Sequence, residues 1–125
     1  MDFTLVKYTE LLKALKNNSY RFVTFEEYCT DKETLTEQKF VILRHDVDLK
    51  AENSFATAKT EHNLGIRASY YFRVIEQSNK PEVIKAIADL GHEIGYHYED
   101  LTICEGKADM AIGHFKTWLD YFRQF

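Results

Sequence analysis

The sequence has few residues that break a chain and no long apolar run. Pro81 is its only proline and no Ser- or Gly-rich stretch occurs, so nothing marks a linker between two domains. No apolar run approaches the roughly 20 residues that a membrane span needs. The start of the chain, residues 1–4, lacks the basic and apolar segments of a signal peptide. We therefore expect one domain, or a piece of one, with no membrane span and no signal peptide.

Cysteines and basic residues are also scarce. Cys29 and Cys104 lie far apart in the sequence and form no CxxC motif. Two reduced thiols in the cytoplasm are the simplest interpretation, and a disulfide between them is the alternative. The net charge of −4 leaves no excess of lysine and arginine for a phosphate backbone. We therefore expect a cytoplasmic protein that does not bind nucleic acid.

The sequence does contain ample material for a core, with nine phenylalanines and eight tyrosines. Apolar residues at helical spacing predict helices over residues 4–16, 50–63, 81–91 and 108–123, and a helical turn over 25–29. Runs of apolar and aromatic residues predict strands over residues 20–24, 39–46, 68–74 and 93–98. Strands that alternate with helices are typical of parallel βαβ units, which gather their sites at the carboxyl ends of the strands.

The predicted fold class is therefore α/β, built from parallel βαβ units. The chain stops inside an aromatic helical pattern, with no cap and no closing strand. Three or four strands cannot close a barrel of seven or eight, and an open parallel sheet leaves a bare edge. We expect residues 1–125 to be a truncated N-terminal portion of a barrel domain, whose open sheet edge a second copy of the chain could cover.

The strongest chemical signal is the run Arg44-His45-Asp46-Val47-Asp48 at the end of a buried strand. Side chains alternate along a strand, so Asp46 and Asp48 are expected on one side, with His45 and Val47 on the packing side. Two carboxylates at the end of an apolar strand repel each other and are costly to desolvate. A divalent cation would remove both costs. The alternative is a solvated acidic turn that helps to cap the next helix.

A second signal follows the last predicted strand. His92 opens this strand and His97 ends it, about 16 Å away, so the two cannot share one metal ion. His97 is level with the two aspartates, whereas His92 is expected to be a structural hydrogen-bonding residue. Glu99 is a further candidate ligand or a neighbour of one, and Gly95 would leave room over the site.

At this point the chain resembles the polysaccharide deacetylase (NodB-homology) family, closest to a divergent branch with a His-Asp-Val-Asp first motif. The similar segments, within residues 40–100, are Arg44-His45-Asp46-Val47-Asp48, Tyr70-Tyr71-Phe72-Arg73 and Gly91-His92-Glu93-Ile94-Gly95-Tyr96-His97. The resemblance implies a distorted (β/α)7 barrel and metal-dependent hydrolysis of an N-acetyl or O-acetyl group on a carbohydrate. It matches Asp46 with the catalytic base and His97 with the first metal-binding histidine.

Three departures from the family pattern weaken the predicted activity more than the predicted fold. Val47 stands where the family has its second, metal-binding aspartate, so Asp48 must substitute for it. Leu101 stands where a second ligand histidine is expected. The later motifs, which supply the catalytic acid, have no match in this chain.

The expected mechanism needs a divalent metal: zinc first, with cobalt, manganese or nickel as alternatives. The metal would activate a water molecule and Asp46 would accept its proton. The predicted metal ligands are Asp48, His97 and Glu99, and the predicted substrate contacts are Arg44, Arg73 and Tyr71. Salt bridges are the alternative role of both arginines. Two other functions stay open, a truncated or degenerate domain without activity and a different metal hydrolase such as a phosphoesterase.

The remaining histidines and aromatic residues have simpler interpretations. His45 is expected to be structural. His62 and His114 fall within predicted helices and are expected on the surface. Residues Phe115, Trp118 and Phe122 repeat at helical spacing, so they are predicted to pack the helix rather than to bind sugar.

Overall fold

The computed structural model describes residues 4–125, and it is a mixed α/β structure with parallel strands. The helices are α1 (Leu5–Asn17), α2 (Phe25–Thr30), α3 (Lys32–Leu35), α4 (Ala51–Asn63), α5 (Pro81–Asp89), α6 (Asp100–Ile103) and α7 (Ala108–Phe122). The strands are β1 (Arg21–Val23), β2 (Phe40–Ile42), β3 (Arg44–Val47), β4 (Ser69–Phe72) and β5 (Glu93–Tyr96). None of these helices is long and apolar enough to cross a membrane. Residues 1–3, on which part of the signal-peptide prediction rests, lie outside the described residues.

The strand predicted over residues 39–46 is wrong in one respect, because it is two strands in two sheets. β2 pairs with β1, whereas β3 pairs with β4. The break lies at Leu43, whose carbonyl oxygen accepts a hydrogen bond from the amide of Ser69. Only Leu43 separates the two strands and no proline, glycine or other turn residue marks the division, so the sequence pattern alone could not reveal it.

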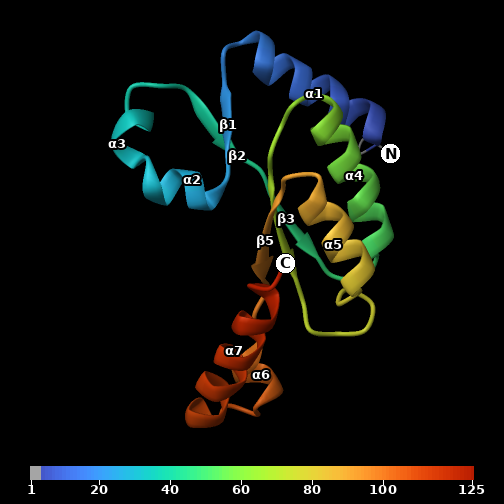
Figure 1. The fold of residues 1–125 in the computed structure, drawn as a ribbon, viewed down its shortest axis with the longest axis vertical. Helices are drawn as coiled ribbons and strands as arrows, with labels where there is room; N and C mark the ends of the chain where they lie inside the picture. The colour runs from blue at the N-terminus through green and yellow to red at the C-terminus, as the bar shows by residue number, and fades with distance from the viewer. Residues whose placement is uncertain (1–3) are drawn as a thin grey trace.

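The second sheet has the strand order β3-β4-β5, and all its pairs are parallel. In Figure 1, α1, α4 and α5 lie together on one side of these strands, and α2 and α3 lie on the other. We call the side that packs on α4, α5 and α7 the helix-covered face, and it carries His45, Val47, Tyr70, Phe72 and Tyr96. We call the other side the open face, and it carries Arg44, Asp46, Tyr71, Gly95 and His97.

The helix α7 packs through its aromatic residues, as predicted. Phe122 stacks on Phe72 and Tyr96, and Phe115 packs against Tyr96. Together with α6, α7 extends away from the rest of the molecule (Figure 1). This pair of helices is joined by side chains as well as by the chain itself.

The prediction that His114 lies on the surface is wrong. Its ring is half-buried, and Nδ1 donates a hydrogen bond to the carboxylate of Asp100 on α6. Its Nε2 accepts a hydrogen bond from Trp118 Nε1 at 3.1 Å. His62 is exposed, as expected. Cys29 and Cys104 are both free thiols, so the alternative of a disulfide between them is wrong.

Candidate functional site

The sheet brings two of the predicted site residues together on the open face. Asp46 is the third residue of β3, and His97 directly follows β5. The amide of His97 donates to the carbonyl oxygen of Phe72 at 2.9 Å, which continues the ladder between β4 and β5. The His97 Nε2 atom then lies 3.7 Å from Asp46 Oδ2. An acid and an imidazole from the two outer strands thus face each other across the sheet.

Arg44 holds the other oxygen of the Asp46 carboxylate. Its Nε donates to Asp46 Oδ1 at 2.8 Å, and its guanidinium lies over the ring of Tyr71 at 4.3 Å from the ring centroid. The Tyr71 ring in turn meets the ring of Phe25 edge to face. Burial, together with the nearby carboxylate of Glu93, raises the pKa of the Tyr71 hydroxyl. Two of the three predicted substrate contacts therefore support the predicted base.

The predicted space above Gly95 is occupied by Tyr71. A Cβ atom at Gly95 would lie 2.6 Å from Tyr71 Cε1, which is closer than such atoms approach. Glycine is therefore needed at this position so that the Tyr71 ring can cross from β4 over β5. The prediction that Gly95 leaves room over the site is wrong, because the Tyr71 side chain fills that space.

The remaining predicted ligands, Asp48 and Glu99, are engaged by Arg73. Arg73 donates to Glu99 Oε2 from Nε at 2.8 Å and from Nη2 at 2.6 Å. Its Nη1 lies 3.9 Å from Asp48 Oδ1. Asp46 and Asp48 thus bind different arginines instead of converging on one point.

No three His, Cys, Asp or Glu side chains in residues 4–125 gather into a set that could hold a metal ion. As arranged, the predicted ligands therefore do not fit a bound metal. One atom of the site is nevertheless left unused: His97 Nδ1 is buried and has no hydrogen-bond partner within the part of the chain that the structure describes.

A buried acid that was not predicted from the sequence lies on the helix-covered side of the sheet, opposite the candidate site. Glu61 on α4 is fully buried, and its carboxylate accepts hydrogen bonds from Tyr8 at 2.5 Å, Tyr70 at 2.6 Å and His45 Nε2 at 2.6 Å. We call these four residues the Glu61 cluster. Burial by itself would raise the pKa of Glu61, but the hydrogen bond from His45 and its electrostatic attraction, with the hydrogen bonds from both tyrosines, lower it.

The Glu61 cluster shows what the first motif's histidine does. His45 turns to the helix-covered face and binds Glu61, which confirms its predicted structural role. A signal for Glu61 was present in the sequence: it lies three residues after Ala58, on the stripe of α4 that is buried. An acid on the apolar stripe of a helix indicates a buried partner.

His92 is structural, as predicted. Its Nε2 donates to the carbonyl oxygen of Ala58 at 3.0 Å, and its Nδ1 accepts from the amide of Ala68 at 3.1 Å. Both ring nitrogens are thus used by the neutral imidazole. Burial accordingly lowers the pKa of His92.

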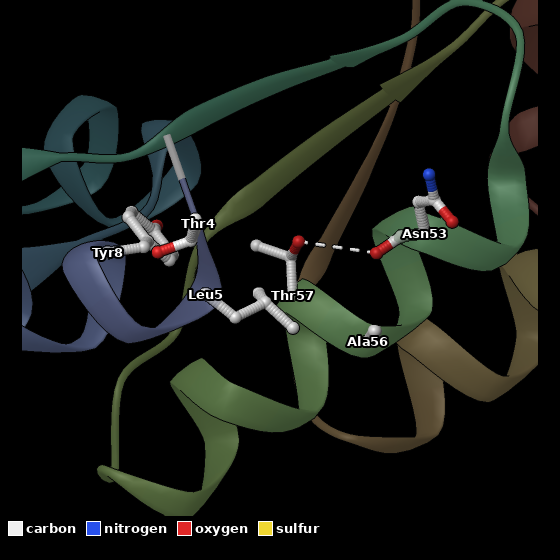
Figure 2. Close-up of a pocket in the computed structure, with 6 residues that line it drawn as sticks. All are labelled: Thr4, Leu5, Tyr8, Asn53, Ala56 and Thr57. Carbon is white, nitrogen blue, oxygen red and sulfur yellow. Dashed lines mark hydrogen bonds between the residues drawn. The ribbon is translucent and has the colours of Figure 1, made fainter. Parts of the chain in front are cut away.

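A separate hollow of about 420 Å³ lies between α1 and α4 (Figure 2). It is lined by Thr4, Leu5, Tyr8, Asn53, Ala56 and Thr57. Thr57 donates its hydroxyl to the backbone oxygen of Asn53, and the hydroxyl of Thr4 caps α1 by accepting from Lys7. None of the predicted site residues lines this hollow.

Comparison of the chain with protein-family models, with curated proteins and with solved structures gave no match.

Proposed function

We propose that the open face is the hydrolytic site of a carbohydrate-deacetylase-like domain, which removes an N-acetyl or O-acetyl group from a sugar. The observation that carries this proposal is the approach of Asp46 to His97 across the sheet, at 3.7 Å. Parallel sheets place their sites at the carboxyl ends of the strands, where both residues lie. We also propose that the two small sheets form one side of a distorted (β/α)7 barrel.

In this proposal Asp46 is the general base. Arg44 binds Asp46 Oδ1, so the carboxylate is held with Oδ2 toward His97. A water molecule between Oδ2 and His97 would give its proton to Asp46 while its oxygen attacks the acetyl carbonyl carbon. The negative charge that develops on the carbonyl oxygen would be stabilised by a nearby cation, for which Arg44 and Arg73 are the candidates. The tetrahedral intermediate would then break its bond to the sugar nitrogen or oxygen, and this leaving atom would take up the proton that Asp46 received, which leaves acetate and the free sugar amine or hydroxyl.

Metal dependence stays a prediction, with zinc preferred over cobalt, manganese and nickel. Asp48, His97 and Glu99 would have to meet at one point, which requires Arg73 to leave both carboxylates. We therefore assign no step of the reaction to a metal. The Arg73 ion pairs favour a second candidate function, a degenerate deacetylase-like domain that has kept the scaffold without the chemistry.

The first experiment is an assay of acetate release from a panel of N-acetylated and O-acetylated sugars, with 4-nitrophenyl phosphate as the alternative substrate. We expect acetate release, and we expect Asp46→Asn to slow it by a factor of about 10²–10⁴, the usual contribution of a general base. The matched control is Asp89→Asn, which alters an exposed aspartate bound to Lys85. Hydrolysis of the phosphate ester alone would identify a different class of hydrolase.

Metal binding is tested separately, by thermal unfolding with Zn²⁺, Co²⁺, Mn²⁺ and Ni²⁺. A metal that binds the folded chain raises the melting temperature, and this rise should disappear in Asp48→Ala. Acetate release without any such rise would mean that the hydrolase works without a metal. If the chain releases no acetate and no metal raises its melting temperature, the result favours the degenerate domain.

A further inference from the structure

The Glu61 carboxylate is surrounded by hydrogen-bond donors. Tyr8 and His45 both bind its Oε1, and Tyr70 binds its Oε2. The ring of His92 also lies near, with its Nδ1 3.8 Å from Oε2, but that atom already accepts a hydrogen bond from the backbone amide of Ala68. All three neighbours can donate to a carboxylate at once, whereas a protonated carboxyl group or an amide brings its own hydrogen, and one of the three would have to stop donating and accept it. The cluster is therefore built for a carboxylate.

His45 connects this carboxylate to the strand of the candidate site. It lies between Arg44 and Asp46 on β3, with its side chain on the opposite face. The His45 ring stacks on the ring of Tyr70, with centroids 4.5 Å apart, and these two residues are partners in the β3–β4 register. Glu61 binds both rings, so it holds the two strands in this register through their side chains.

β3 has few other restraints. It is four residues long, and among the strands of residues 4–125 it pairs with β4 alone. At its carboxyl end Val47 is buried, and the hydroxyl of Ser78 donates to the Val47 carbonyl oxygen. A slip of β3 by one residue would turn every side chain to the other face. Such a slip would set Arg44 or Asp46 against Glu61, and the second of these contacts would place two carboxylates together.

We propose that Glu61 is a positioning residue for the candidate site, because it fixes β3 through His45 and so sets where Asp46 stands relative to His97. Asp46 lies on one outer strand, β3, and His97 directly follows the other, β5, so their separation depends on the placement of β3 against β4. The value of this proposal for catalysis rests on the proposed function, but the placement of β3 can be measured without any activity.

The test compares two substitutions of His45 by amide hydrogen exchange at pH 7. His45→Gln keeps an N–H donor for Glu61, and His45→Leu removes it. We expect the β3 amides to exchange at least about tenfold faster in His45→Leu, the usual cost of one hydrogen bond to a charged group. We expect His45→Gln to stay close to the wild type. Equal β3 exchange in the two variants would overturn the proposal.

A second test removes the negative charge of Glu61 on α4. Glu61→Gln should accelerate exchange of β3 more than exchange of α7, whereas Glu52→Gln on the same helix changes only an exposed acid bound to Lys80 and should accelerate neither. A uniform acceleration over the whole chain would contradict a positioning role. If Glu61→Gln does not fold, the two His45 variants decide the matter.

Activity provides a separate readout. In the acetate-release assay, His45→Leu should lower kcat and leave KM nearly unchanged, with His45→Gln restoring kcat. A loss confined to KM would contradict positioning of the base. If the wild type releases no acetate, the proposed function fails, and the exchange of β3 still decides whether Glu61 positions the strand.

Discussion

The acidic residues on the two sides of β3 differ in burial and in the number of their hydrogen-bond partners. On the helix-covered face, the carboxylate of Glu61 is fully buried and accepts hydrogen bonds from three side chains. On the open face, Asp46 keeps 41% of its side chain exposed, and its partner Arg44 keeps 48%. Neighbouring residues of one strand, His45 and Asp46, thus belong to a closed network and to an open one.

The comparison teaches that burial separates a structural acid from a candidate catalytic one. A buried carboxylate must be paired in full, because each missing partner costs desolvation energy. A carboxylate at the surface can leave one oxygen facing a second functional group, since water can satisfy it. The Glu61 cluster therefore stabilises the fold, and the Asp46–His97 pair is available for chemistry.

The largest expected effect comes from removing the buried acid. Glu61→Ala leaves His45, Tyr8 and Tyr70 with buried donors and no acceptor, so we expect the free energy of unfolding to fall by roughly 3–5 kcal/mol. Urea denaturation followed by the fluorescence of Trp118 measures it. Glu52→Ala is the control and should change it by less than about 0.5 kcal/mol. Equal losses in the two variants would remove the distinction between the faces.

Lowering the pH should reduce the free energy of unfolding through two residues of the helix-covered side, Glu61 and His92. The lowered pKa of Glu61 means that its contribution to stability is complete above its ordinary pKa of 4.5 and is lost as the pH falls through the folded value. The lowered pKa of His92 adds an earlier loss, which begins as the pH falls below 6.5. Urea denaturation at pH 7, 5, 4 and 3 should show stability falling in the wild type. The fall below pH 4.5 should be smaller in Glu61→Gln, and an identical fall would refute the assignment.

A substitution of intermediate effect is Gly95→Ala on the open face. The new Cβ would press on the Tyr71 ring, so we expect a loss of about 1–3 kcal/mol, typical of overpacking. In a Tyr71→Ala background the same change should cost almost nothing. Gly113→Ala in α7 is the control: its Cβ would meet nothing within 4 Å, and the helix should gain up to about 1 kcal/mol.

The smallest expected effect is that of Arg44→Ala. Its ion pair with Asp46 is exposed and its contact with Tyr71 is a surface cation–π interaction, so the free energy of unfolding should fall by no more than about 1 kcal/mol. The same urea experiment measures it. A loss as large as that of Glu61→Ala would show that the open face is also structural.

Much of the fold could be predicted from the sequence, because local patterns encode it. The long helices α1, α4, α5 and α7 follow apolar residues at helical spacing, and their observed ends differ from the predicted ones by a residue or two. The structural roles of His45 and His92 followed from alternation and from position along their strands. The division of one predicted strand into β2 and β3 could not be predicted from the sequence. It depends on which strand each segment pairs with, β1 for β2 and β4 for β3, and hydrophobicity does not encode this choice.

By itself the sequence determined which side chains can share a face, since alternation along β3 separates His45 from Asp46 before any folding is considered. Only the tertiary structure decided which groups meet. In the folded chain Asp46 lies beside His97, and Arg73 pairs with both Asp48 and Glu99. The Tyr71 ring lies above Gly95. The physical reason is that these contacts join residues 24 to 51 positions apart, and their distances depend on how the strands pack side by side rather than on any local spacing.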